Sequence, residues 1–214
     1  MHENLFGNVT GAKGIVKISD PHTGEVFVHQ ENAIHFGNIS YAITKALEGD
    51  DIGHIKWMVF GSGGTSIDSS GNISYRSPNT STLQDPSAEP YQATYWEDLT
   101  ATGNNIQTIA GTSNYSDLTS TVLIGFGEPD SASPEFEQSV TDTATTTNGQ
   151  YVFDELALYT GTSMGTLGTT GNPGTFDFEP VNGRMLTHIV FHPVQKAANR
   201  EIQIEYTIRV QMGP

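Results

Sequence analysis

The sequence predicts a mainly β protein: an antiparallel β-sandwich with one short helix and long polar loops. The clearest observation is the segment 202–211, where apolar and polar residues alternate over ten positions. Such alternation gives one buried and one wet face, as in an antiparallel sheet. A parallel sheet would instead show continuous apolar strands separated by helices, and only residues 38–48 have helical spacing. The pattern therefore favours a sandwich with a helix laid across it.

The first two strands are predicted at residues 14–18 and 25–29, joined by a tight turn. The turn has the sequence Asp-Pro-His-Thr-Gly, in which Pro21 presets φ and Gly24 supplies a positive φ. The chain therefore reverses direction between two alternating segments, and a hairpin results.

The helix is predicted over about residues 38–48. Asn38 can cap its start and Gly49 lies where a C-cap glycine belongs. Its apolar residues follow helical spacing: Ile39, Ala42, Ile43, Ala46 and Leu47. A short helix is marginal by itself, so we expect this apolar face to pack on the sheet.

Further strands are predicted at residues 55–60, 121–126, 151–159, 184–191 and 202–211, and the fourth of these leads into a loop at His192 and Pro193. Between Gly61 and Asp117 the chain is mostly polar and contains Pro78, Pro86 and Pro90. Prolines discourage strands, and a long segment without periodicity is typical of a functional loop or arm. We therefore expect one domain, residues 1–214, that carries a long arm at about 61–117.

The charge and the residue composition exclude several classes. Asp and Glu number 24 against 9 Lys and Arg, a net charge of −15. Nucleic-acid binding needs clustered basic residues, and an anionic membrane surface would repel this chain. The absence of cysteine excludes disulfides and thiolate metal sites. Neither a signal peptide nor an apolar span is visible, which predicts synthesis and folding in a cytoplasm.

The segment Gly161-Thr162-Ser163-Met164-Gly165 matches the G-x-S-x-G pattern of serine hydrolases. That motif needs a sharp turn from a strand into a helix, with backbone N–H groups behind the serine. Here another loop rich in glycine and threonine follows, at 166–174. A flexible loop is therefore the favoured interpretation.

Neither a pair of histidines nor a pair of adjacent carboxylates in the sequence has the spacing of a functional site. His188 and His192 would lie roughly 13 Å apart on a strand, too far to share a metal ion. Asp154 and Glu155 are adjacent on a strand, so we expect them on opposite faces, where they cannot form a catalytic pair. Ordinary surface or core roles are favoured for the histidines.

Two loops resemble ligand-binding motifs only in part. The glycine-rich segment 61–64 lacks the lysine and the following helix of a phosphate loop. The segment 68–72 has too few carboxylates for a calcium loop and is interpreted as an ordinary turn. No catalytic, cofactor or metal site is predicted.

Four aromatic residues are candidate partner contacts: Trp57, Tyr91, Tyr95 and Trp96. Side by side in one groove, they could stack on sugar rings, as in a carbohydrate-binding receptor-recognition module. A role in the core or at an interface is favoured. The segments 61–117 and about 160–180 are further candidates for contact with neighbouring proteins.

Several segments together resemble virion structural proteins of tailed phages, of the T4-like cyanophage and contractile-tailed marine phage type. In that family a T-G-E-V hairpin leads to an N-A-I-H segment and a short helix, and an F-G-N-G-G-T stretch follows. The matching segments here are residues 16–18, 23–26, 31–35, 58–65, 151–158 and 186–196. Ser62 replaces the Asn of the glycine stretch.

The resemblance implies a non-enzymatic structural component of a virion, made in the host cytoplasm and assembled as a homo-oligomer on other virion proteins. It implies no cofactor. Net acidity, good solubility and size suit an added outer part and favour a capsid decoration (cement) protein. A neck, tail or baseplate component is the alternative within the class, and the carbohydrate-binding module is the alternative from another class.

Overall fold

The computed structural model describes residues 11–110, 114–129, 150–163 and 180–211. In this part the chain is mainly β, with one α-helix and one short 3-10 helix. The elements are β1 (Gly11–Ser19), β2 (Val26–Ile34), α1 (Phe36–Glu48), η1 (Asp51–Gly53), β3 (Ile55–Gly61), β4 (Thr65–Ile67), β5 (Ile73–Tyr75), β6 (Ala93–Asp98), β7 (Asn105–Ala110), β8 (Tyr115–Ile124), β9 (Gln150–Thr160), β10 (Met185–Ala197) and β11 (Ile202–Gln211).

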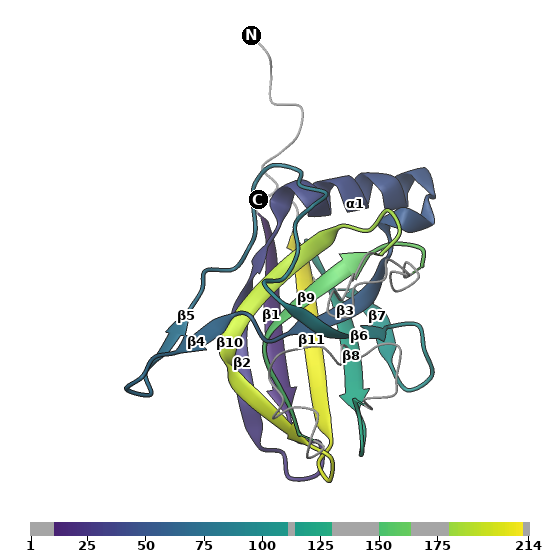
Figure 1. Cartoon of the computed structure of the whole chain (residues 1–214). Helices are drawn as coiled ribbons and strands as arrows, with labels where there is room; N and C mark the ends of the chain where they lie inside the picture. The colour runs from purple at the N-terminus through teal and green to yellow at the C-terminus, as the bar shows by residue number, and fades with distance from the viewer. Residues whose placement is uncertain (1–10, 111–113, 130–149, 164–179, 212–214) are drawn as a thin grey trace, which may run out of the picture.

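Nine of the strands form one antiparallel sheet in the order β6-β3-β9-β10-β2-β1-β11-β8-β7. The sheet curls so that its two halves face each other, and α1 lies across the top in Figure 1. Side chains from both halves meet in one core cluster, for example Phe60 and Phe153 with Val122 and Tyr206. The antiparallel, sandwich-like fold predicted from the sequence is confirmed.

The hairpin of β1 and β2 is confirmed, and Gly24 has the expected positive φ of 73°. Asp20 stabilises the turn because its Oδ1 accepts hydrogen bonds from the backbone N–H groups of His22 and Thr23, at 2.8 and 2.9 Å. These contacts and the Coulombic attraction of Arg200 outweigh partial desolvation and lower the pKa of Asp20.

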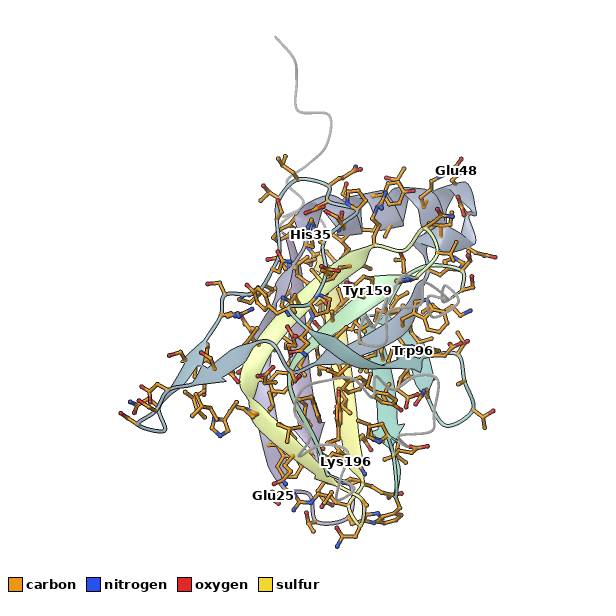
Figure 2. The ribbon with its side chains drawn as sticks, viewed as in Figure 1. Glu25, His35, Glu48, Trp96, Tyr159 and Lys196 are labelled. Carbon is orange, nitrogen blue, oxygen red and sulfur yellow. The ribbon has the colours of Figure 1, made fainter. Side chains whose placement is uncertain are left out.

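The helix is confirmed, but it begins two residues earlier than predicted, at Phe36. The N-cap is His35, whose Nδ1 accepts a hydrogen bond from the Asn38 N–H. The side chain of Asn38 is instead buried and donates to the backbone carbonyls of Asp85 and Met185. Gly49 is the expected C-cap, with a φ of 84°. Figure 2 shows His35 and Glu48 at the two ends of α1.

The last strand is confirmed as the clearest sequence signal, because Ile202, Ile204, Tyr206 and Ile208 are all buried at alternate positions. The predicted loop at His192 and Pro193 is wrong, since β10 continues to Ala197. The pairing of β10 with β9 shifts register between Val190 and Val194. A bulge at that point accommodates the proline, which has no N–H to give to the sheet.

The predicted arm at 61–117 contains strands β4 to β7 and the start of β8, so the expectation of a long segment without strands is wrong. The polar pattern is misleading because β6 and β7 are the two end strands of the sheet. β4 and β5 form a separate hairpin that projects from the body in Figure 1.

Residues 76–92 connect β5 to β6, and we call this segment the strap. It contains the three prolines noted in the sequence, Pro78, Pro86 and Pro90. The strap covers the outer face of the sheet, where Ala88 packs with Trp57, Ala157 and Tyr159. The Tyr159 hydroxyl donates to the Ala88 carbonyl at 3.1 Å. A segment without periodicity is thus ordered by the sheet beneath it.

Candidate functional site: a buried carboxylate clamp

Two carboxylates lie in the middle of β9, between the core residues Phe153 and Leu156. Asp154 is 4% exposed and Glu155 has no exposed surface. Regular alternation would put Phe153 and Leu156 on opposite faces, yet both belong to the same core cluster. The bulge between β9 and β10 breaks the alternation here, so the prediction that the carboxylates simply point to opposite faces is wrong.

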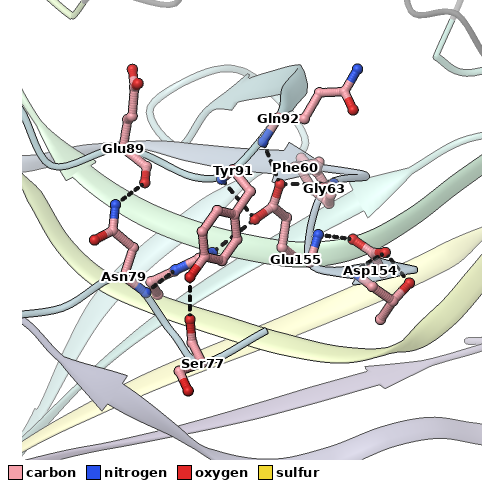
Figure 3. A network of polar contacts seen from close by, with 12 residues as sticks. Phe60, Gly63, Ser77, Asn79, Glu89, Tyr91, Gln92, Asp154 and Glu155 are labelled. Atoms are coloured by element: carbon pink, nitrogen blue, oxygen red, sulfur yellow. Dashed lines mark hydrogen bonds and ion pairs between the residues drawn. The ribbon is translucent and has the colours of Figure 1, made fainter. Parts of the chain in front are cut away.

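Glu155 binds three backbone N–H groups from two segments far away in the sequence (Figure 3). Its Oε1 accepts from Gly63 at 3.1 Å and from Gln92 at 2.8 Å. Its Oε2 accepts from Tyr91 at 3.0 Å. We call residues 61–65, from the end of β3 onward, the glycine loop. One carboxylate therefore holds the glycine loop and the end of the strap together.

His188 on β10 completes the coordination of Glu155. Its Nε2 lies 2.9 Å from Glu155 Oε2, and its side chain is fully buried. Its Nδ1 accepts a hydrogen bond from the Asn79 backbone N–H at 2.7 Å. Because Nδ1 is an acceptor, the geometry assigns the ring proton to Nε2, directed at the carboxylate. The Tyr91 ring lies against the imidazole, with centroids 5.6 Å apart.

Asp154 binds the next two residues of the same glycine loop. Its Oδ1 accepts from the Gly64 N–H at 2.9 Å, and its Oδ2 accepts from the Thr65 N–H at 2.8 Å and from the Thr65 hydroxyl. We call Asp154, Glu155 and His188 the clamp. Between them they receive six hydrogen bonds from backbone N–H groups, counted as three to Glu155, two to Asp154 and one to His188.

The pKa values of the two carboxylates move in opposite directions. Burial raises the pKa of Glu155, but hydrogen bonds from His188, Gln92 and Tyr91 outweigh burial, so its pKa is lowered overall. Burial dominates at Asp154 and raises its pKa, although its contacts with Thr65 and Gly64 oppose that change.

The loop needs glycine at residues 63 and 64 because its backbone packs too closely against neighbouring atoms to leave room for a Cβ. A Cβ at Gly63 would lie 2.8 Å from the Gln92 nitrogen and from the Tyr91 Cβ. A Cβ at Gly64 would lie 2.8 Å from Val190 Cγ1 and 3.1 Å from the Asp154 carbonyl oxygen. The glycine-rich stretch thus serves packing against β9 and the strap, and the clamp is a device that fixes backbone.

Sequence reasoning did not identify the clamp. The signal that could have found it is the presence of charged residues inside apolar strands: Asp154 and Glu155 between Phe153 and Leu156, and His188 between Leu186 and Ile189. An ionisable residue at a core position needs a partner, because burying an unpaired charge is costly. The pattern of neighbouring residues does not show which groups are the partners of these three side chains, because the partners are remote in sequence.

The four aromatic candidates do not share one groove. Tyr95 is 5% exposed and packs on Phe60 in the inner core. Trp57 and Trp96 meet edge to face on the outer side of the sheet, with Trp57 4% exposed. Tyr91 is the most exposed at 39%, and its hydroxyl donates to the Ser77 carbonyl of the strap. These side chains do not form the sugar platform considered from the sequence.

The remaining motifs are placed as follows. The Val181 N–H donates to the Ser163 carbonyl, whereas Met164 and Gly165 of the G-x-S-x-G match lie outside the described residues. His192 is exposed and contacts the Tyr75 hydroxyl, while His188 is buried in the clamp. Asp68 accepts hydrogen bonds from Ser70 and Asn72 within the turn between β4 and β5, so that segment is an ordinary turn as predicted.

Within the described ranges, no group of three or more His, Asp or Glu side chains is arranged to hold a metal ion. The helices of this part of the chain include none that is long and apolar enough to cross a bilayer. Comparison with family models, curated proteins and solved structures found no match.

Proposed function

We propose that this chain is a non-enzymatic structural component of a tailed-phage virion that assembles as a homo-oligomer on other virion proteins. The observation that supports the proposal is the meeting of three of the segments on which the resemblance rests. Residues 58–65 supply the glycine loop, residues 151–158 the two carboxylates, and residues 186–196 the histidine.

The convergence matters because the segments are far apart in sequence and are joined through backbone N–H groups. Glu155 and Asp154 accept from the loop, and His188 accepts from the strap. A hydrolase site would need a general base or nucleophile with a free oxygen or nitrogen directed at a substrate. The polar atoms of the clamp instead accept hydrogen bonds from the backbone of the chain itself and hold its segments in place, which suits a rigid building block.

Within the virion we propose a capsid decoration role. The chain carries a net charge of −15, which favours solubility of an added outer part and docking on a basic patch of a neighbouring protein. The projecting β4–β5 hairpin offers a contact outside the packed body (Figure 1). A neck, tail or baseplate position is the alternative, and it predicts a different copy number.

The test is the copy number of this protein in purified particles of the virus that encodes it, measured by quantitative mass spectrometry against the major capsid protein. Hundreds of copies would support decoration of the head. A small multiple of the neck or tail symmetry would overturn decoration and support the alternative. Absence from particles would overturn the structural proposal as a whole.

A further inference from the structure

The sheet ends in two edge strands, β6 and β7, and these differ in chemistry. An edge strand presents unpaired backbone N–H and C=O groups on its free side, and proteins usually protect such edges with charges, prolines or bulges. β6 ends in Glu97 and Asp98, which provide charge. β7 has the sequence Asn-Ile-Gln-Thr-Ile-Ala and has neither charge nor proline.

The neutral character extends beyond the strand itself. From Thr100 to Ser116 the sequence contains no Asp, Glu, Lys, Arg or His, in a chain of net charge −15. The next charge, Asp117 on β8, is neutralised by Arg209 through two contacts of 2.7 Å. The sheet edge at β7 is therefore an uncharged strip on an acidic protein.

The side chains of β7 are open to solvent on the outer face. Ile109 is 51% exposed, and Asn105 and Gln107 on the same face are exposed as well. The register of β7 against β8 is regular along all six residues, without a bulge that would turn the edge away. Among the described residues, no backbone group bonds to the free side of β7.

The inner face of the same strand borders an apolar groove of about 500 Å³ beneath α1. Ile106 and Thr108 line it from β7, and Ile43 and Ala46 line it from the helix. A strand added beside β7 would continue this face of the sheet, and its alternate side chains would point toward the groove.

We propose that β7 pairs antiparallel with β7 of a second copy of this chain, across a two-fold axis. The pairing satisfies the free edge of both copies at once, because identical antiparallel strands present matching donors and acceptors. A basic partner would be attracted to the acidic surface. A second copy of this chain is equally acidic, so electrostatic repulsion is smallest if the two copies meet at the uncharged strip. The inference rests on the homo-oligomer of the proposed function and names the strand through which two copies pair. A monomer in solution would overturn this pairing, whereas the copy number in particles tests the virion role separately.

The geometry places Gln107 near the axis. In a register centred on Gln107 or on Thr108, the two Gln107 side chains are opposite or diagonal neighbours on the outer face. Like charges introduced there would repel each other, and opposite charges would attract. The experiment therefore uses full-length Gln107→Lys and Gln107→Glu variants, studied separately and mixed.

Sedimentation velocity and native mass spectrometry up to about 100 μM would detect a dimer with a micromolar Kd. We expect the wild-type chain to dimerise and each single variant to raise Kd by about tenfold or more. The mixture should form the heterodimer at near wild-type affinity, which also shows that both variants fold. Leu123→Lys is the matched control, because Leu123 is an exposed aliphatic residue on the inner strand β8, and it should leave Kd unchanged.

A second readout uses the absence of cysteine from the chain. Gln107→Cys should be cross-linked into dimers by a short bis-maleimide, whereas Ser66→Cys on the exposed strand β4 should not. A monomeric wild type, including one that pairs only with another protein, would overturn the proposal. So would a dimer that the charge variants leave unchanged.

Discussion

Glu155 and His188, on neighbouring strands β9 and β10, face each other at 2.9 Å with both side chains fully buried. Both carboxylate oxygens of Glu155 and the Nδ1 atom of His188 also accept hydrogen bonds from the glycine loop and from the strap. This pair therefore joins four segments of the chain at one point, and it is where substitutions should be most informative.

Glu155→Gln should destabilise the protein by about 1–3 kcal/mol, because an amide NH2 group replaces one of the two acceptor oxygens and leaves buried N–H donors without a partner. Urea unfolding followed by circular dichroism measures the change. Glu205→Gln is the control, since Glu205 forms a half-exposed ion pair with Lys17 at 3.5 Å. Such pairs contribute less than about 1 kcal/mol. Equal losses in the two variants would contradict a special role of the clamp.

The contribution of Glu155 should depend on pH with a defined sign. Its pKa is lowered on folding from the ordinary value of 4.5, so its stabilisation is fully present above that value and is lost as the pH falls through the folded pKa. The difference in unfolding free energy between the wild type and Glu155→Gln should therefore shrink below about pH 4.5. A difference that stays constant from pH 7 to acid would exclude this assignment.

Asp154 should titrate with the opposite sign. Its pKa is raised from 3.8, so ionisation of this carboxyl opposes folding, and the cost appears as the pH rises from 3.8 through the folded pKa. Asp154→Asn should accordingly gain stability relative to the wild type over that rise. The same urea titrations measure it, and a relative loss of stability with rising pH would show that hydrogen bonding outweighs burial at this residue.

Gly61→Ala should cost about 1–3 kcal/mol, since overpacking forces neighbouring atoms to move. The new Cβ would lie 2.4 Å from Glu155 Oε1 and 2.5 Å from the Gln92 carbonyl oxygen. Ser62→Ala, one residue along the same loop, adds no atom and serves as the control. Thermal unfolding of both variants tests the expectation, and a Gly61→Ala protein as stable as Ser62→Ala would show that the loop can shift freely.

Several elements could be predicted because their signal is local. The hairpin of residues 14–29 follows from a turn containing Pro21 and Gly24, and the end of α1 follows from Gly49. The start of the helix was predicted too late because Asn38 is a favoured capping residue, whereas its side chain is buried against Asp85 and Met185 and His35 caps the helix instead. That decision depends on segments remote in sequence.

The edge strands and the strap were hidden for a related reason. β7 shows no regular alternation of apolar and polar residues. It lies at the end of the sheet, where most of its side chains are exposed and burial does not select for alternation. The strap has no period at all, and its path is fixed by contacts such as those of Asn79 with His188 and of Ala88 with Tyr159. Polarity alone therefore could not distinguish an ordered cover from a free arm.

The sequence by itself determined the antiparallel β class, the main hairpin, the existence of the helix and the exclusion of disulfides, since periodicity, turn residues and composition are properties of neighbouring positions. Only the tertiary structure decided the clamp. A bulge turns Asp154 and Glu155 toward one loop, and sheet pairing brings His188 beside them. Burial forces these charges to find partners, and the fold alone determines which partners lie within reach.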